Sequence, residues 1–444
     1  MSNAGEPVDI GGVLDEGRWG RYPIFVVALA ALAIIFDGVD IQTLGVAIPS
    51  LMQDWQIDRA PFKWVSALGL VGMASGSVIL GILGDRFGRR RALITSLFVL
   101  GACTAASAYA TGVETLTVLR FLAGLGLGGA LPNASALTSE YVPRRHRPLA
   151  VTLTIVCVPL GAALTGFIAK KLPDVHTWQT LFTLGGGSAI VIAVVLSLLL
   201  PESPRYLARD PARWPELAKL LARMERAQPE GSSFVDLREQ DVRRTSVMAL
   251  LTPQFRHDTL LLWAAFFTCL FSIYLAFTWL PATIRAAGLS PDVANQGLAV
   301  YNLGGVAGAI IAAFLIGRYG SKGTMSIIAV IAIAGAIVLS AIPFEAEEVT
   351  RIIVMLGITG GAINAVQTTL YALAAHIYPT SVRATGVGAA STIGRFGSIT
   401  SSFLGVIGGS STFFVFTAIA MVGTTLALLF IRRHVAGAQS RPGV

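Results

Sequence analysis

The sequence predicts an all-α membrane protein with twelve transmembrane helices in two pseudo-symmetric six-helix bundles. Of its 444 residues, 54% are hydrophobic and only 13% are charged, whereas a soluble domain averages about 25% charged residues. A membrane span needs about 20 mostly apolar residues, so twelve spans require about 240 residues, which is close to the number of hydrophobic residues present. This composition excludes a disordered chain, a fibrous chain and an ordinary cytosolic enzyme.

Twelve apolar segments, each bounded by polar or charged residues, are expected to form the membrane helices. They are residues 22–48, 61–84, 92–109, 115–138, 149–169, 178–200, 259–284, 293–317, 323–342, 352–375, 384–407 and 412–431. The polar stretches divide the chain into a tail (1–21), a first bundle (22–200), a linker (201–258), a second bundle (259–431) and a second tail (432–444). The linker therefore splits the spans six and six.

The distribution of lysine and arginine predicts how the chain lies in the membrane. If the N-terminus is cytoplasmic, most of the 33 lysine and arginine residues fall on the cytoplasmic side of the predicted spans, as the positive-inside rule requires. We therefore expect a multi-pass protein with both termini in the cytoplasm. The same asymmetry accounts for the net charge of +8 without a nucleic-acid partner.

The linker contains one segment with helical periodicity, residues 214–227. Leu217, Leu220, Leu221 and Met224 recur at the spacing of one helix face. We expect a short amphipathic helix on the inner membrane surface, whose role is to tether the two bundles.

The two predicted bundles share internal repeats, which indicates a duplicated unit. Residues 81–90 resemble residues 313–322, and residues 140–147 resemble residues 376–383, with nearly equal spacing between the members of each pair. Both pairs fall at the inner ends of matching spans. Duplicated bundles are typical of secondary transporters, which bind their substrate between the two halves.

The first span carries two acids, Asp37 and Asp40. A charge within a span costs several kcal/mol unless it is paired or hydrated, so it marks a functional position by default. Residues three apart lie on the same side of a helix, and two neighbouring carboxylates resist joint ionisation. One of the two can therefore hold a proton, which predicts proton coupling, with Asp40 as the better candidate. The alternative is an acid that is fixed by a buried arginine and never titrates.

Two arginines also lie within the predicted spans. Arg120 is expected at about the depth of Asp40 from the helix rise of ~1.5 Å per residue, which predicts an ion pair, although Arg120 could instead extend to the outer interface. Arg395 lies near the middle of the eleventh segment, and no acid is expected at matching depth in the second bundle. We expect Arg395 to bind a substrate carboxylate; a pair with Asp37 or Asp40 across the bundle interface is the alternative.

Polar and aromatic side chains gather near mid-depth in the second bundle. Aromatic rings can stack on a planar ligand, and amides and phenols can form hydrogen bonds, although any one of these residues is more often a packing residue. Besides Arg395, the candidate substrate-binding residues are Tyr274, Trp279, Asn302, Gln367 and Tyr371, with Tyr301 and Asn364 at similar depth. As a group they favour a flat substrate with polar edges.

Charged residues at the inner ends of the spans are candidate gates. Salt bridges there, Glu140 with Arg147 and His376 with Arg383, could close the inner mouth and break when it opens; the alternative is that these residues only set topology and form surface pairs. The candidates from position alone are Glu140, Arg147, His376 and Arg383.

The sequence shows no motif for other chemistry. The glycine run 124–129 lies in an apolar segment without a neighbouring strand, so it favours close helix packing over nucleotide binding. The sequence has no phosphate loop, nucleophilic triad or metal-ligand set, and its three cysteines lie inside apolar segments. We therefore expect neither an enzyme nor a bound cofactor or metal.

These motifs together resemble two nested families. The six-plus-six plan and the loop 81–90, with Asp85, Arg86 and Gly88, resemble the major facilitator superfamily. Further motifs resemble its aromatic acid:proton symporter family, namely DGVD (37–40), RFLAG (120–124), EYVP (140–143), PESPR (201–205) and the set His376, Pro379, Arg383 and Arg395. The paired acids are the most telling of these, whereas PESPR is shared with carriers of sugars and other organic solutes.

The resemblance implies proton-coupled import of a benzoate-like or hydroxylated aromatic carboxylate through a bacterial cytoplasmic (inner) membrane, by a transporter that works as a monomer. It assigns the loop residues Asp85, Arg86 and Arg89 to the conformational switch, as part of the gate. It assigns to transport the residues Asp37, Asp40, Arg120, Glu140, His376, Arg383 and Arg395. Open alternatives are a carrier of sugars or aliphatic organic acids, an exchanger or exporter, and a receptor that binds an aromatic acid without moving it. In the second half Gly317 stands in place of Asp85 and Ser321 in place of Arg89, which argues against a symmetric gate.

Overall fold

The computed structural model describes residues 7–171, 177–228, 232–237, 247–379 and 382–435. Twelve long helices run through this part of the chain. They are α2 (Arg21–Trp55), α3 (Phe62–Phe87), α4 (Arg89–Ser107), α5 (Val113–Tyr141), α6 (Arg147–Lys171), α7 (Thr177–Leu199), α11 (Arg256–Ala286), α12 (Pro291–Tyr319), α13 (Ser321–Ala341), α14 (Val349–Ile377), α15 (Arg383–Leu404) and α16 (Ser410–Phe430). The predicted all-α fold is confirmed.

Ten of these helices are long and apolar enough to cross a membrane, as judged over the described residues. The other two are α4, which begins with three arginines, and α15, which is rich in glycine, serine and threonine and carries Arg395. Polar and charged residues in a span face the interior of the bundle or a hydrated cavity. The lower hydropathy of α15 therefore indicates that its polar side faces the interior of the molecule.

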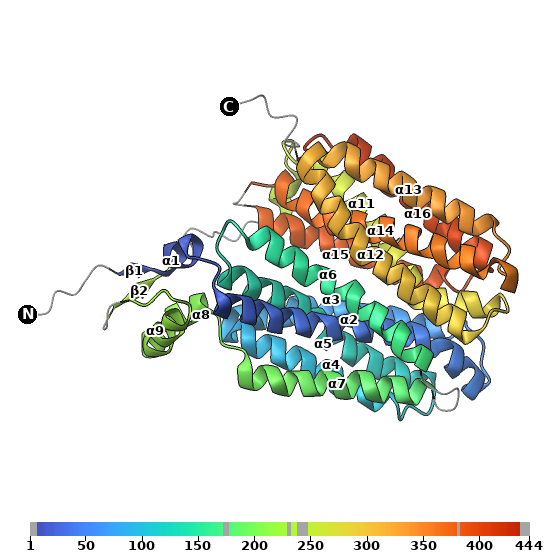
Figure 1. Cartoon of the computed structure of the whole chain (residues 1–444), viewed down its shortest axis with the longest axis horizontal. Coiled ribbons are helices and arrows are strands. Elements are labelled where there is room, and N and C mark those ends of the chain that lie inside the picture. The colour runs from blue at the N-terminus through green and yellow to red at the C-terminus, as the bar shows by residue number, and fades with distance from the viewer. Residues whose placement is uncertain (1–6, 172–176, 229–231, 238–246, 380–381, 436–444) are drawn as a thin grey trace, which may run out of the picture.

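The long helices form two groups (Figure 1). Helices α2–α7, coloured blue to green, pack beside helices α11–α16, coloured yellow to red. The start of α2, the end of α16 and the short helices α1, α8 and α9 lie at one end of the molecule, which we call the linker face. We call the opposite end, which carries the turn at 56–61 between α2 and α3, the far face.

Glycines allow the closest helix contacts within the first group. A Cβ atom on Gly124 of α5 would lie 2.2 Å from the carbonyl oxygen of Gly69 in α3, and one on Gly128 would lie 2.0 Å from that of Met73. Small residues at this spacing let helix backbones approach in membranes. The glycine run 124–129 therefore serves helix packing, as predicted.

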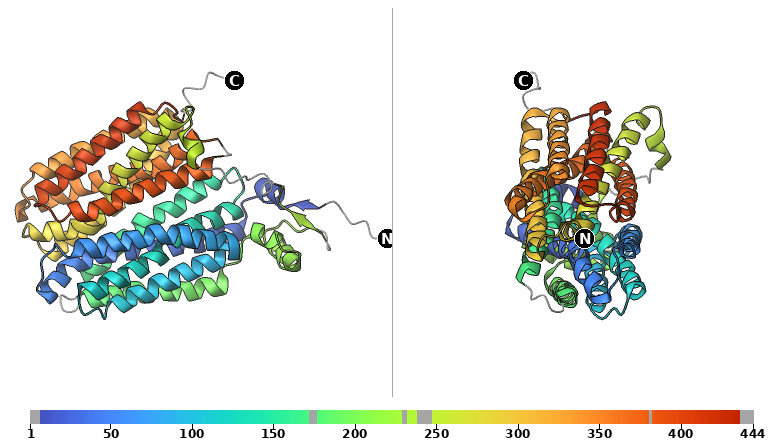
Figure 2. Two further views of the ribbon diagram at one scale, coloured as in Figure 1. Left: turned by 180° about the vertical axis from the view of Figure 1, so that it is seen from behind. Right: turned by 90° about the vertical axis from the view of Figure 1, so that its right-hand side faces the viewer.

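A small folded unit projects from the linker face (Figure 2). Strand β1 (Val8–Asp9) pairs in parallel with strand β2 (Phe234–Val235). The remaining short elements of the described chain are the helices α1 (Ile10–Glu16), α8 (Pro204–Ala208) and α9 (Trp214–Arg223), and the 3-10 helices Pro211–Arg213, Val247–Leu251 and Ala346–Glu348. The first described residues of the chain thus fold together with the linker.

The apolar face of α9 is buried inside this unit. Leu217, Leu220 and Leu221 belong to the same buried cluster as Ile10 and Leu14 of α1. The helix forms where its periodicity predicts, but the prediction that it lies on the membrane surface is corrected. Its apolar face is covered by protein, in a buried cluster that includes residues of the predicted N-terminal tail.

The buried core that joins the two halves lies toward the far face. Leu51, Phe62 and Phe182, near the far ends of their helices, belong to one buried cluster with Phe277 and Leu280 of the second group. A second cluster joins the linker side of the first group to the small unit. The halves therefore share a buried core near the far face.

Candidate functional site

A cavity lies between the two halves, near the middle of the long helices. Apolar residues form much of its wall, including Leu131, Val158, Leu270 and Ile273. Its polar and charged residues are Asp37, Tyr274, Asn364, Gln367, Tyr371, Ser391 and Arg395. We call it the central cavity. It combines an apolar wall with a few polar groups, as small-molecule sites do.

Opposite charges face the central cavity from the two halves. Asp37 comes from α2 and Arg395 from α15. Asp37 is only 1% exposed, and its Oδ1 atom has no hydrogen-bond partner among the described residues. Both side chains line the cavity, but among the described residues they do not form an ion pair with each other. Arg395 is thus a cation that faces the cavity opposite a buried acid.

Asp40 lies in a separate ion-paired network. Arg120 Nη1 is 3.3 Å from Asp40 Oδ1, and Arg120 Nη2 donates hydrogen bonds to the hydroxyls of Thr104 at 2.7 Å and Ser107 at 3.2 Å. The Thr104 hydroxyl in turn donates to Asp40, and the Arg120 guanidinium lies 5.1 Å from the centre of the Phe182 ring. Arg120 is 4% exposed, so it does not extend to the far face.

The two acids open into different cavities. Asp40 and Arg120 line a second cavity, together with Ser66 and Thr278. We call it the side cavity. Three residues, Ile41, Tyr274 and Phe277, line both the side cavity and the central cavity. The spacing of the acids predicts one shared helix face, but the structure separates them by this common wall.

Two tyrosines give the central cavity aromatic surface. The Tyr274 hydroxyl donates to the Met73 sulfur at 3.6 Å, which is a weak acceptor. The Tyr371 hydroxyl lies 3.4 Å from that of Ser391, and its ring packs edge-on against Phe266. Both phenols therefore have weak or long contacts that a ligand could replace.

Two predicted substrate-binding residues lie away from this cavity. Trp279 is fully buried near the far face, beneath the guanidinium of Arg59. Asn302 is fully buried in α12, and its amide donates to the Leu298 carbonyl of the same helix at 2.9 Å. The prediction for Trp279 and Asn302 is therefore corrected. Position along a span sets the depth of a side chain but not the direction in which it points.

At the linker face, the loop 81–90 and the PESPR motif (201–205) are joined by polar contacts. Arg89 pairs with Asp85, and its Nε lies 3.8 Å from Glu140, which also accepts a hydrogen bond from Ser203. Glu202 accepts hydrogen bonds from the backbone N–H groups of Arg90 at 3.0 Å and Ser203 at 2.9 Å. Glu202 thereby satisfies a free backbone donor at the start of α4.

Gly88 allows the loop 81–90 to pack closely against Glu202. Its φ of +104° favours glycine, and a Cβ atom there would lie 2.2 Å from Glu202 Oε2. The glycine of the first motif thus leaves room for the glutamate of the second.

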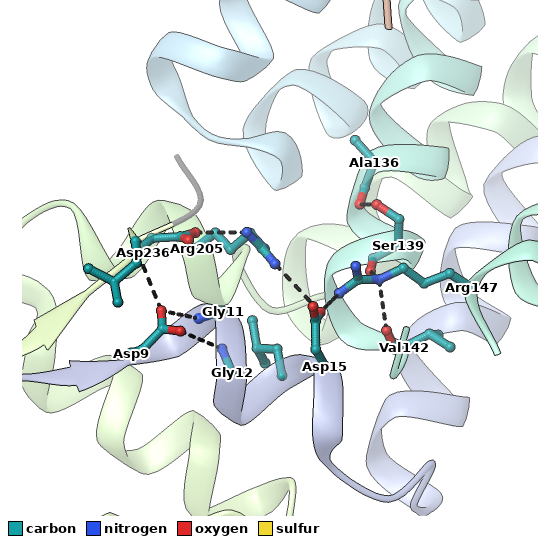
Figure 3. Close-up of polar contacts among 12 residues, drawn as sticks. Asp9, Gly11, Gly12, Asp15, Ala136, Ser139, Val142, Arg147, Arg205 and Asp236 are labelled. Atoms are coloured by element: carbon teal, nitrogen blue, oxygen red, sulfur yellow. Dashed lines mark hydrogen bonds and ion pairs between the residues drawn. The ribbon is translucent and has the colours of Figure 1, made fainter. Parts of the chain in front are cut away.

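The expected pair of Glu140 with Arg147 is replaced by other contacts. Arg147 forms an ion pair with Asp15 of α1, and its Nε donates to the Val142 carbonyl at 3.1 Å (Figure 3). Arg205 lies 3.7 Å from Asp15 and 2.8 Å from Asp236. Asp15 is therefore shared by two arginines, and burial lowers the pKa of Arg147. The N-terminal segment, predicted as a tail, supplies the acid.

The remaining gate candidates lie at the ends of helices on the linker face. Arg383 Nε donates to the Tyr378 carbonyl at 3.3 Å, which caps the end of α14. His376 is exposed in the last turn of α14. The Arg86 guanidinium lies 5.3 Å from the Phe87 ring. Among the described residues, histidine, cysteine and acidic side chains do not gather into a metal site.

Comparison with known proteins assigns the family. A family model described as the Major Facilitator Superfamily matches residues 30–402. The chain belongs to this superfamily. It is 36% identical over 402 residues to the 4-hydroxybenzoate transporter PcaK of Pseudomonas aeruginosa, which covers 90% of this chain and 89% of that one. It is 33% identical over 424 residues to a gallate transporter of Pseudomonas putida, which covers 96% and 91%.

A solved structure supports the same fold. The inward-open xylose transporter XylE of Escherichia coli superposes with a TM-score of 0.73 at 15% identity, over 93% of this chain and 97% of that chain. The family model and the named relatives make this chain a multi-pass membrane transporter and not an enzyme, as the sequence predicts.

Proposed function

We propose that this transporter imports an aromatic carboxylate of the benzoate or hydroxybenzoate class together with protons. The observation that carries the proposal is the central cavity, where Asp37 and Arg395 face one space beside the rings of Tyr274 and Tyr371. The relatives named above are transporters of 4-hydroxybenzoate and gallate, which supports the substrate class. We further propose a single working chain in a bacterial inner membrane, with the linker face in the cytoplasm.

Arg395 is the proposed anchor for the substrate carboxylate. A guanidinium presents a planar fork that matches a carboxylate with two parallel hydrogen bonds. The rings of Tyr274 and Tyr371 offer aromatic surface for the substrate ring, and the amide of Gln367 can bond polar ring substituents. A flat aromatic acid therefore uses every kind of group that the cavity offers.

Asp37 is the proposed link between substrate and proton. An ionised Asp37 would compete with the substrate carboxylate for Arg395, and two carboxylates sharing one site repel each other. A buried carboxylate without partners is also costly to ionise. A proton on Asp37 removes the repulsion and leaves Arg395 free for the substrate, so anion and proton enter together.

The pair of Asp40 with Arg120 is the second proposed coupling element. It is closed by Thr104 and Ser107 and lies across the common wall from the substrate. A shift of Tyr274 on substrate binding changes both cavities, because its ring lines each of them. We propose that protonation of Asp40 weakens its ion pair when the halves move.

The packing of the two halves supports a proposal of alternating access. The shared core near the far face supports a state that is closed there and opens toward the linker face. In this state the substrate leaves into the cytoplasm, and Asp37 then loses its proton. The network of Asp85, Arg89 and Glu140 ties together the linker-side ends of the first half during the switch. Substrate can drive the switch only through different affinities for the two states.

Competition for uptake tests the substrate class. Purified protein in proteoliposomes with an acidic exterior receives labelled 4-hydroxybenzoate, with excess unlabelled benzoate, citrate or glucose. We expect benzoate to compete and the other two to have no effect. Competition by citrate or glucose, with no effect of benzoate, would assign the carrier to aliphatic acids or sugars instead. Specific binding without uptake would indicate a receptor.

A further inference from the structure

Arg59 reaches from the first half of the molecule to the second at the far face. It lies in the turn between α2 and α3, where its carbonyl accepts a hydrogen bond from the Phe62 N–H at 3.2 Å. Its Nη2 atom donates to the carbonyl of Gly405 at the end of α15 and to the hydroxyl of Thr283 in α11 at 3.2 Å. Its guanidinium lies 4.8 Å from the centre of the Trp279 ring.

The contacts of Arg59 with the second half are electrostatic and reversible. The carbonyl end of a helix carries partial negative charge, and Gly405 is the C-cap of α15. The cation is therefore held by a carbonyl, a hydroxyl and a ring, all from the second half. Burial lowers the pKa of Arg59 to about 10, so the side chain stays charged at neutral pH. A Cβ atom on Gly405 would lie 2.0 Å from Trp279, so glycine is required for this approach.

A second layer of contacts lies just beneath Arg59. The hydroxyl of Ser66 in α3 lies 3.3 Å from that of Thr278 and 2.9 Å from that of Ser402. The ring of Trp64 packs edge-on against Phe403 at 5.1 Å between centroids. These pairs also join the first half to the second, and Ser66 and Thr278 line the side cavity that holds Asp40. Opening the far face requires all of them to separate.

We propose that Arg59 is the far-face gate residue, which stabilises the state closed to that side and must release α15 before substrate can enter. This inference rests on the proposed alternating access. Arg59 lies outside the residues that line the central cavity, so it acts by positioning the two halves and touches no substrate. Its loss should shift the population toward the far-open state by about tenfold, as expected for one charged hydrogen-bonding group.

Accessibility from the far side tests this proposal without knowledge of the substrate. A single reporter is introduced as Leu44→Cys, at the wall of the side cavity, in a chain whose three native cysteines are replaced by serine. A membrane-impermeant maleimide is added on the far side of intact cells. We expect slow labelling with Arg59 present, about tenfold faster labelling with Arg59→Ala and an intermediate rate with Arg59→Lys. Lysine keeps the charge but loses the fork.

Two further variants keep the test decisive. Arg351→Ala removes another far-face arginine, whose ion pair with Glu348 lies within the second half, and it should leave the labelling rate unchanged. Thr283→Val removes one acceptor without changing size and should raise the rate severalfold; it decides the question if Arg59→Ala fails to fold. Parental labelling rates in both Arg59→Ala and Thr283→Val would overturn the gate. Faster labelling in a protein that transports no aromatic acid would keep the gate and refute the proposed substrate.

Discussion

Replacement of Asp37 by asparagine should separate substrate exchange from proton-driven accumulation. Asparagine keeps the size and hydrogen-bonding capacity of the protonated acid, but it cannot release a proton. Because Asp37 is 1% exposed and faces the cavity of Arg395, the change leaves the guanidinium free for the substrate carboxylate. We expect exchange of labelled for unlabelled substrate at near-parental rates, with loss of the share of uphill accumulation that Asp37 couples.

The expected loss of accumulation in Asp37→Asn is that of one coupled proton. Each coupled proton supplies about 1.4 kcal/mol per pH unit. A gradient of one pH unit, with the membrane potential clamped at zero, therefore sustains about tenfold accumulation for the proton on Asp37, and Asp37→Asn loses this factor of ten. A second proton carried by Asp40 would raise the parental value to about a hundredfold and leave tenfold in the variant.

The assay compares exchange and accumulation in the same proteoliposomes. Asp58→Asn changes an exposed acid in the far-face turn and serves as the matched control, with parental behaviour expected in both measurements. Full accumulation by Asp37→Asn would refute the coupling role of this residue. Loss of exchange as well as accumulation would show that the carboxylate is needed for binding rather than for coupling.

Three further changes test other parts of the account. Arg395→Ala should raise the KM for 4-hydroxybenzoate by roughly 10- to 100-fold, from the loss of hydrogen bonds to a charged group worth about 1.5–3 kcal/mol, and uptake kinetics with an unchanged KM would exclude it as the anchor. Asp40→Asn leaves Arg120 buried without its ion pair, so thermal unfolding should show a loss of about 3–5 kcal/mol; the double variant with Arg120→Gln should recover most of it, and no recovery would contradict the pairing argument. Burial lowers the pKa of His434 below its usual value near 6.5, so its neutral form is favoured in the folded state and stability should fall as the pH drops below that value; an equal fall in His434→Gln would assign the effect elsewhere.

The helices and their depths could be predicted because hydropathy reports how far a residue lies along a span. This is why Asp40 and Arg120, on different helices, were expected at similar depth, and the structure has them 3.3 Å apart. The facing direction of a side chain depends on how the helices are rotated and packed. Trp279 and Asn302 therefore could not be separated from Tyr274 by sequence alone.

Contacts between segments that are distant along the chain also could not be predicted from the sequence. Asp15 lies in a stretch with the composition of a polar tail, yet it binds Arg147 and Arg205 because α1 folds onto the linker. In the sequence, Arg59 is only one positive charge in a short loop between two apolar segments. Its neighbours Thr283 and Gly405 come from the other half, and only the packed structure brings the three together.

Uphill uptake tests the central claim most directly. Proteoliposomes with a neutral interior and an acidic exterior receive labelled 4-hydroxybenzoate, with and without a protonophore. Proton-coupled import predicts accumulation above the external concentration that collapses when the protonophore is added. Accumulation that persists with the protonophore, or equilibration without accumulation, would contradict proton coupling.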